Sequence, residues 1–271
     1  MDQALTSAGC AGEVLAALAD GRSITNFTAR DPAFGVTEAY AVAEALHRAR
    51  RARGERVAGR KIGFTNRTIW PLYGVHEPIW GHAYDTTVVY AQGGRAEIPV
   101  GPLPEPRIEP EIVLHFASAP PTTRDEAAIL ACVDWIAHGF EVVVCPFRDW
   151  KFKLADTVAA NGLHGALVVG QPVPVADLPD CVRKLREFRL TLLKDGKPHA
   201  EGTGANVLDS PLLAFAHFAG VLARLPQFAP VGAGEVVTTG TLTDAYPVKA
   251  GERWSTRLAG IELPGLEIVF R

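Results

Sequence analysis

Two short apolar segments that carry three glutamates constrain this chain more than any other feature. Residues 107–114 read Arg-Ile-Glu-Pro-Glu-Ile-Val-Leu, and residues 140–144 read Phe-Glu-Val-Val-Val. Both segments are rich in β-branched residues and are typical of strands. Glu109 and Glu111, at positions i and i+2, are therefore expected on the same strand face, roughly 6.5–7 Å apart at about 3.3 Å per residue.

The chemistry of this face depends on whether it is buried. Two like charges at that separation repel by roughly 2–3 kcal/mol at an effective dielectric of about 20, and Glu141 would add to the repulsion. A buried face would therefore need a cation, and three carboxylates without a neighbouring cysteine or paired histidine favour Mg²⁺ or Mn²⁺ over zinc. Pro110 removes a ladder donor, as is typical of strand edges and bulges near active sites. The alternative from spacing alone is a solvated strand face with an unrelated Glu141.

Composition limits the classes of partner. The 271 residues are 48% hydrophobic and 21% charged, which indicates a globular protein with one large core, or a core and a small appended domain. A net charge of −3 gives no attraction to phosphate backbones, and no run of 18 apolar residues could span a bilayer, so neither nucleic acid nor membrane is expected as a partner. The start of the chain lacks signal-peptide features and the four cysteines form no C-x-x-C pair, which favours a cytoplasmic protein with free thiols.

The first 60 residues have a helical pattern. One helix is expected over residues 13–19, ended by Gly21, and a second from an N-cap at Thr37 to about Gly54. Both helices are short of large apolar residues, so they are expected to pack on the main domain or on another subunit. Six arginines crowd the end of the second helix, where solvated cations that complement the helix dipole are the first interpretation and an anion site or subunit contact the second: Arg48, Arg50, Arg51, Arg53, Arg56 and Arg60.

Strands dominate the rest of the chain. A capping box at residues 123–126 predicts a helix to about His138 that leads directly into the strand of Glu141. Asp195-Gly196 predicts a hairpin over residues 188–201, and Ser210 followed by Pro211 predicts a helix to about Ala223. Further strands are expected at 165–170, 236–242, 254–258 and 266–270. Because helices and strands do not alternate regularly, the pattern favours the α+β class with a mixed or antiparallel β core.

Six ordered motifs carry a family resemblance that extends over nearly the whole chain. Together they resemble the 2-keto-4-pentenoate hydratase / 2-oxohex-3-enedioate decarboxylase family of the fumarylacetoacetate hydrolase superfamily. The motifs are Gly-Arg-Lys-Ile-Gly-Phe-Thr at 59–65, Gly-Val-His-Glu-Pro at 74–78, Pro-Arg-Ile-Glu-Pro-Glu-Ile at 106–112, Asp-Trp-Lys-Phe with Asp-Thr-Val-Ala between 149 and 159, Gly-Thr-Gly-Ala at 202–205 and Thr-Gly-Thr-Leu at 239–242.

The resemblance implies a fold, a cofactor and an activity. The expected fold is a fumarylacetoacetate-hydrolase-like mixed β-roll, with a small, mainly helical N-terminal region over residues 1–75 and a β-rich catalytic domain over residues 76–271. Glu109, Glu111 and Glu141 would hold Mg²⁺ or Mn²⁺. The implied enzyme is a homo-oligomer, a dimer or higher, that hydrates a short 2-hydroxydienoate or 2-oxoenoate in aromatic-compound catabolism through a metal-stabilised enolate.

Three alternatives to the hydratase stay open on the same resemblance, two other activities and one non-catalytic role. A decarboxylase acting on 2-oxohex-3-enedioate would use the same metal as its electron sink. A C–C hydrolase of acylpyruvates shares the superfamily's fold, and fold alone does not determine function. The chain could also be a non-catalytic metal-binding relative.

The resemblance also assigns residues to the substrate site. The family's lysine corresponds to Lys61, in a predicted glycine-flanked turn, where it would hold the substrate's carboxylate or enolate oxygen or move a proton. Thr65, Lys151, Gly240 and Thr241 are the candidates for substrate contacts. The alternatives are a surface lysine at position 61 and ordinary loop hydrogen bonds elsewhere.

Two positions depart from the hydratase pattern. Apolar Ile79 stands where hydratases of the family carry an acid, as in the decarboxylase branch, and Ala160 stands where the family has aspartate. Ile79 is still expected to contact substrate. His82 and Asp85 are the nearby candidates to replace the missing proton carrier, although a single histidine in a loop is more often a surface residue.

Overall fold

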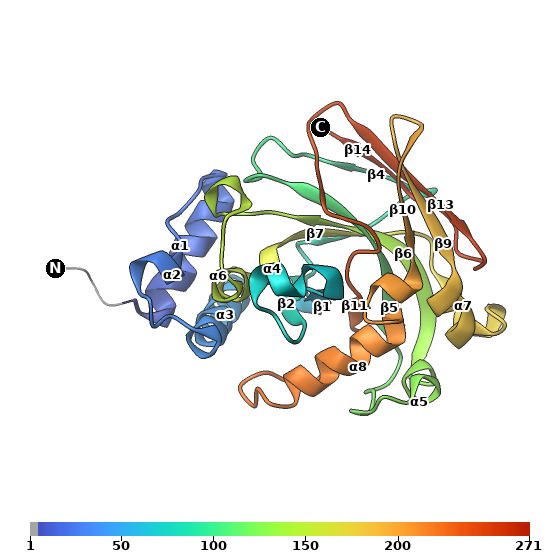
Figure 1. Ribbon diagram of the computed structural model, residues 1–271, viewed down its shortest axis with the longest axis horizontal. Coiled ribbons are helices and arrows are strands. Elements are labelled where there is room, and N and C mark those ends of the chain that lie inside the picture. The colour runs from blue at the N-terminus through green and yellow to red at the C-terminus, as the bar shows by residue number, and fades with distance from the viewer. Residues whose placement is uncertain (1–4) are drawn as a thin grey trace.

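The computed structural model describes residues 5–271, which form a mixed helix and sheet protein (Figure 1). The helices are α1 Ser7–Asp20, α2 Phe27–Arg30, α3 Val36–Ala52, α4 Trp70–Tyr73, α5 Glu126–Leu130, α6 Leu154–Ala159, α7 Cys181–Glu187 and α8 Pro211–Leu222. Short 3₁₀ turns are η1 Arg67–Ile69, η2 Arg148–Trp150, η3 Asn161–Leu163, η4 Val175–Asp177 and η5 Gly204–Asn206. The strands are β1 Val57–Gly63, β2 Ile79–Tyr84, β3 Val88–Tyr90, β4 Arg95–Ile98, β5 Arg107–Phe116, β6 Val133–Val143, β7 His164–Val169, β8 Val173–Pro174, β9 Arg189–Lys194, β10 Lys197–Thr203, β11 Val236–Thr238, β12 Tyr246–Pro247, β13 Arg253–Ala259 and β14 Glu267–Phe270.

The strands form two sheets. The larger has the order β2-β1-β11-β5-β6-β7-β3, with β12 added to β5 and β8 added to β6, and the smaller has the order β10-β9-β13-β14-β4. Pairing is antiparallel except between β1 and β11, β3 and β7, and β14 and β4. Figure 1 shows the curled sheets on one side and α1, α2 and α3 on the other. The predicted α+β class with a mixed β core is confirmed.

A long antiparallel pair at the centre, β5 with β6, carries the glutamates. Its register runs from Arg107 opposite Val143 to Phe116 opposite Val133. Pro110 does not interrupt it, because the carbonyl of Pro110 points away from β6 and accepts from Leu242 N at 2.9 Å. The N and O atoms of one strand residue point to the same side. The nitrogen of Pro110, which carries no hydrogen, therefore faces the loop between β11 and β12. No strand ladder on that side needs a donor from it.

The helix predicted up to His138 is wrong. Helix α5 ends at Leu130 and β6 already begins at Val133. Asp125 is the N-cap, since its carboxylate accepts from the N–H groups of Ala127 and Ala128. The capping residue therefore fixes where the helix begins but not how far it extends. The segment from Val133 is rich in β-branched and aromatic residues and pairs along the whole of β5.

The N-terminal region packs onto the rest of the chain. Helix α3 contacts α1 and α6, and Phe27 lies against Phe147 with ring centroids 6.2 Å apart. Helix α3 begins at Val36, so Gly35 is its N-cap in place of Thr37, and the carboxylate of Glu38 accepts from Gly35 N at 3.0 Å. Strand β1 pairs with both β2 and β11. The large sheet therefore crosses the boundary predicted at residue 75, between the regions 1–75 and 76–271.

Not all of the arginines near the end of α3 are solvated. Arg60 lies on β1, is buried, and pairs with Glu235 at 2.5 Å. Arg50 pairs with Glu55 at 2.8 Å, and its side chain is 13% exposed. The solvated interpretation therefore fails for Arg60, because β1 carries it into the sheet.

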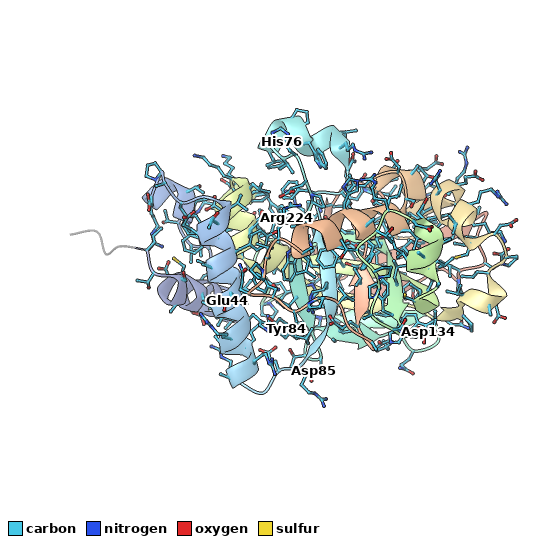
Figure 2. All side chains as sticks on the ribbon, turned by 90° about the horizontal axis from the view of Figure 1, so that it is seen from below. Glu44, His76, Tyr84, Asp85, Asp134 and Arg224 are labelled. Atoms are coloured by element: carbon cyan, nitrogen blue, oxygen red, sulfur yellow. The ribbon has the colours of Figure 1, made fainter. Side chains whose placement is uncertain are left out.

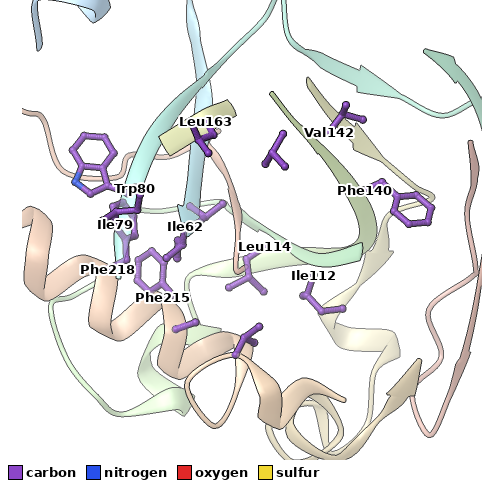
Figure 3. Packing of buried hydrophobic residues seen from close by; sticks show 14 of the residues in the cluster. Ile62, Ile79, Trp80, Ile112, Leu114, Phe140, Val142, Leu163, Phe215 and Phe218 are labelled. Atoms are coloured by element: carbon purple, nitrogen blue, oxygen red, sulfur yellow. The ribbon is translucent and has the colours of Figure 1, made fainter. Parts of the chain in front are cut away.

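Helix α8 covers the β1–β2 edge of the large sheet. Phe215 and Phe218 of α8 lie with Ile62, Ile79 and Trp80 in the hydrophobic core (Figure 3). Among the described residues, the segment Gly204–Leu222 is the one helical stretch with the length and mean hydropathy to cross a membrane, yet 61% of that window is buried inside the protein itself. This burial is that of a core helix.

Candidate active site

The strand register brings the three glutamates together. Glu109 lies directly opposite Glu141, and Glu111 lies opposite Gly139, all on one face of the β5–β6 pair. One carboxylate oxygen from each of the three lies within 4.8 Å of the others. Glu111 and Glu141 are fully buried, and Glu109 is partly open to a cavity. The alternative of a solvated strand face with an unrelated Glu141 is therefore excluded.

Lys61 is a cation that lies among these carboxylates. It lies in the strand β1 rather than in a turn, and its side chain is buried. Its Nζ lies 3.0 Å from Glu141 Oε2 and donates to the carbonyl of Gly162 at 2.9 Å. Burial lowers the pKa of Lys61, but Glu141, Glu109 and Glu111 outweigh burial, so this pKa lies above its ordinary value. The alternative of a surface lysine is excluded.

The three carboxyl groups differ in their affinity for protons. Burial raises the pKa of Glu111 well above its ordinary value, and Glu141 and Glu109 add to this increase. Although Glu109 opens to the cavity, burial raises its pKa to about 7. Burial also acts on Glu141, but Lys61 and the hydrogen bond from His164 outweigh it and hold the pKa of Glu141 below its ordinary value. One ammonium thus compensates one carboxylate, and two remain without full compensation.

The donor set fits a hard divalent ion. Glu111 Oε2 accepts from Gly240 N at 2.7 Å, whereas the buried Oε1 of Glu111 has no hydrogen-bond partner among the described residues. A buried carboxylate oxygen without a partner is costly. Oxygen ligands alone, with two uncompensated carboxyls, suit Mg²⁺ or Mn²⁺.

A cavity of about 470 Å³ opens beside the carboxylates. Lys61, Glu109, Thr65, Ile79 and Thr241 all line it. Five aromatic side chains contribute to its walls, those of Phe64, Tyr73, Trp150, Phe152 and Tyr246. Such walls exclude water and leave a few polar groups to orient a small ligand.

Gly240 shapes this site through its backbone. Its φ is +97°, and a Cβ there would lie 1.9 Å from Thr65 Oγ1. Only glycine can therefore occupy this position while its N–H points at Glu111. The structure thus places Gly240 beside the metal candidates, and Thr65 and Thr241 in the cavity wall.

Three predicted residues lie away from both the carboxylates and the cavity. Lys151 is exposed, with its Nζ 3.7 Å from Asp149 Oδ2. Asp85 is exposed at the edge of the molecule and binds Arg56 at 2.9 Å (Figure 2).

His82 is buried on the face of β2 opposite Ile79, where its ring stacks on that of His47 with centroids 4.0 Å apart. Burial, with Arg60 and His47, lowers the pKa of His82 well below its ordinary value. The structure therefore does not bring His82, Asp85 or Lys151 to the cavity.

Sequence reasoning missed three groups around the site. His164 Nδ1 donates to Glu141 Oε1 at 2.7 Å, and the carbonyl of Gly162 binds Lys61. Arg107 lines the cavity with its guanidinium 3.9 Å from the centre of the Trp150 ring. Only Arg107 left a signal in the sequence, because it shares the i, i+2 spacing of Glu109 and Glu111 and so belongs to the same strand face.

The sheet architecture and the buried carboxylate cluster define a fumarylacetoacetate hydrolase-type protein, and comparisons with known proteins agree. The family model "Fumarylacetoacetate (FAA) hydrolase C-terminal" matches residues 72–264. The chain is 33% identical over 90% of both chains to 2-hydroxyhexa-2,4-dienoate hydratase of Comamonas testosteroni. It is 32% identical over 94% of both chains to 2-keto-4-pentenoate hydratase of Burkholderia vietnamiensis.

A solved structure matches over the full length of both chains. It is 4-oxalocrotonate decarboxylase from Pseudomonas putida G7, complexed with magnesium and adipate, with a TM-score of 0.89 and 26% identity. The chain therefore belongs to the 2-keto-4-pentenoate hydratase / 2-oxohex-3-enedioate decarboxylase family of the fumarylacetoacetate hydrolase superfamily.

Proposed function

We propose that this chain is a divalent-metal-dependent hydro-lyase that adds water to a short 2-hydroxydienoate or 2-oxoenoate in aromatic-compound catabolism. The observation that carries the proposal is the cluster of Glu109, Glu111 and Glu141 with Lys61 at the wall of a largely apolar cavity. The names of the curated relatives support a hydratase.

Each side chain has a role that follows from its place. Glu109, Glu111 and Glu141 would hold Mg²⁺ or Mn²⁺, which when bound supplies Lewis-acid stabilisation of negative charge on a 2-oxo oxygen. Lys61 binds a substrate oxygen or moves a proton at its Nζ. Thr65 and Thr241 offer hydroxyl groups that orient the substrate. The aromatic walls exclude bulk water, which strengthens these polar contacts.

Decarboxylation of a 2-oxoenedioate is the second candidate, and Arg107 is the observation that favours it. A buried Nε of Arg107 has no hydrogen-bond partner within residues 5–271, although its side chain lines the cavity. A guanidinium with free donors suits a carboxylate. A second substrate carboxylate would satisfy it, and apolar Ile79 removes the acid expected of a hydratase.

Product analysis decides between these candidates. Purified protein with Mg²⁺ is incubated separately with 2-hydroxypenta-2,4-dienoate, with 2-oxohex-3-enedioate and with an acylpyruvate, and the products are identified by NMR and CO₂ release. A 4-hydroxy-2-oxo acid from the first substrate supports the hydratase. Release of CO₂ from the second, with no hydration of the first, reverses the ranking. Cleavage of an acylpyruvate alone would favour the C–C hydrolase, and metal binding without turnover a non-catalytic relative.

Replacing Ile79 with aspartate is expected to raise kcat for hydration of the dienoate by on the order of tenfold or more. Ile79 is buried in the cavity wall, where a carboxyl group keeps its proton more readily and can act as a general acid. The loss of dienoate absorbance measures the rate. Ile79→Asn is the matched control, because asparagine has nearly the same shape as aspartate but carries no acid. Equal rates in the two variants would rule out an acid role for this position.

Four finer properties belong to the same proposal. Mg²⁺ or Mn²⁺ is proposed as the ion because solved relatives were crystallised with Mg²⁺, Ca²⁺ or Mn²⁺. A homo-oligomer and a cytoplasmic location remain predictions that rest on the family resemblance. A small 2-oxo acid is the proposed substrate.

A further inference from the structure

His164 is held at both ends of its imidazole ring in the interior. Its Nδ1 lies 2.7 Å from Glu141 Oε1, and its Nε2 lies 2.9 Å from Thr87 Oγ1. A carboxylate can only accept, so Nδ1 carries the hydrogen that Glu141 receives. Thr87 Oγ1 is fixed in turn, since it accepts from Tyr84 N at 3.0 Å. The ring therefore has one orientation relative to Glu141.

An irregular stretch of backbone places this ring. The register between β6 and β7 shifts between Val142 and Val143, which brings His164 opposite Val143. Three consecutive residues before it, Asn161, Gly162 and Leu163, have φ values of 56°, 63° and 63°. Leucine in the left-handed region is strained, and such strain persists where the surroundings enforce it.

The surroundings do enforce this left-handed turn. The side chain of Asn161 accepts from His82 N at 2.8 Å and donates to His82 O at 2.9 Å, which ties the turn to β2. Leu163 is buried in the hydrophobic core with Ile62 and Trp80 (Figure 3). A Cβ on Gly162 would lie 2.9 Å from Lys61 Cδ, so the turn also packs closely on the lysine.

Residues 161–164 contact both partners of the buried ion pair between Lys61 and Glu141. The carbonyl of Gly162 accepts from Lys61 Nζ at 2.9 Å, and His164 binds Glu141 Oε1. Glu141 is therefore left with Oε2, 3.0 Å from Lys61 Nζ, as the oxygen that it can offer to another cation. His164 thus determines which oxygen of Glu141 is available.

We propose that His164 is a positioning residue that directs Glu141 Oε2 into the three-glutamate site and thereby sets its affinity for a divalent ion. This inference rests on the part of the proposed function in which Glu109, Glu111 and Glu141 bind that ion. Groups that hydrogen-bond to metal ligands orient them, and their loss typically lowers metal affinity by about 10–100-fold.

The test measures Mn²⁺ binding by the decrease of the free-ion EPR signal, in wild type, His164→Phe and His164→Asn. Phenylalanine fills the volume without a donor, whereas asparagine keeps an N–H near the place of Nδ1. We expect His164→Phe to bind Mn²⁺ about 10–100-fold more weakly and His164→Asn to stay close to wild type. Circular dichroism of the metal-free proteins establishes that each variant is folded.

Different outcomes separate this inference from the proposed function. If wild type binds Mn²⁺ and His164→Phe binds it equally well, or if His164→Asn is as weak as His164→Phe, the positioning role is overturned while the metal site stands. If wild type does not bind Mn²⁺, the metal site of the proposed function fails and this inference fails with it.

If His164→Phe does not fold, Thr87→Val decides, because it frees the far end of the ring. Weaker Mn²⁺ binding by Thr87→Val supports the role, and unchanged binding overturns it.

Discussion

Replacing Lys61 with methionine is expected to lower kcat/KM by on the order of 10²-fold or more, about 2.7 kcal/mol of transition-state stabilisation. Methionine has similar length and no charge, so the change removes the ammonium that lies in the cavity wall 3.0 Å from Glu141. Steady-state kinetics with whichever substrate is turned over measures the effect.

Lys151→Met is the matched control for Lys61→Met. Lys151 is exposed and lies outside the cavity lining, so its loss should leave kcat/KM within about twofold. The Lys61 variant should also melt at a lower temperature without metal, because breaking a buried ion pair costs about 3–5 kcal/mol. A Lys61→Met enzyme with wild-type kcat/KM would exclude Lys61 from the chemistry.

Replacing Glu111 with glutamine is expected to weaken Mg²⁺ and Mn²⁺ binding by on the order of 100-fold or more, since even groups that only orient a ligand contribute about 10–100-fold. The fold should be retained. Burial, Glu141 and Glu109 all raise the pKa of Glu111 and so disfavour a charge there, and a neutral glutamine of the same size should fit this position. The hydrogen bond from Gly240 N can also be kept.

Calorimetric titration of both ions measures the effect of Glu111→Gln, and a thermal melt without metal checks the fold. Glu77→Gln is a suitable control, because Glu77 is exposed and pairs with Arg224 on the surface. Equal affinity in wild type and Glu111→Gln would remove Glu111 from the metal site.

The carboxylate cluster was predictable because its determinants are local. Glu109 and Glu111 share a strand face by the two-residue period, and the β-branched segment around Glu141 identified its strand. The same rule could have excluded His82 from the cavity. Positions 79 and 82 are an odd number apart on one strand, so Ile79 in the cavity wall places His82 on the other face.

Other parts of the site depend on tertiary structure that sequence patterns do not encode. The capping signal near Asp125 extended the predicted helix over residues that pair with β5 instead. The left-handed turn before His164 needs the side chain of Asn161 on β2, a contact between residues 79 positions apart. The sequence predicted a turn at Lys61. Its burial in a strand depends on β2 and β11, which pair on either side of β1.

The pairing of β1 between β2 and β11 has a consequence for the order of assembly during synthesis. Strand β1 can pair with β2 soon after both leave the ribosome, but its other edge pairs with residues 236–238, nearly at the end of the chain. Contacts of such long sequence separation form late and slow folding. The strand of Lys61 must therefore stay unpaired on one side until most of the protein has been made. A truncated chain that lacks β11 would expose that edge to other nascent chains and should aggregate rather than fold into a smaller enzyme.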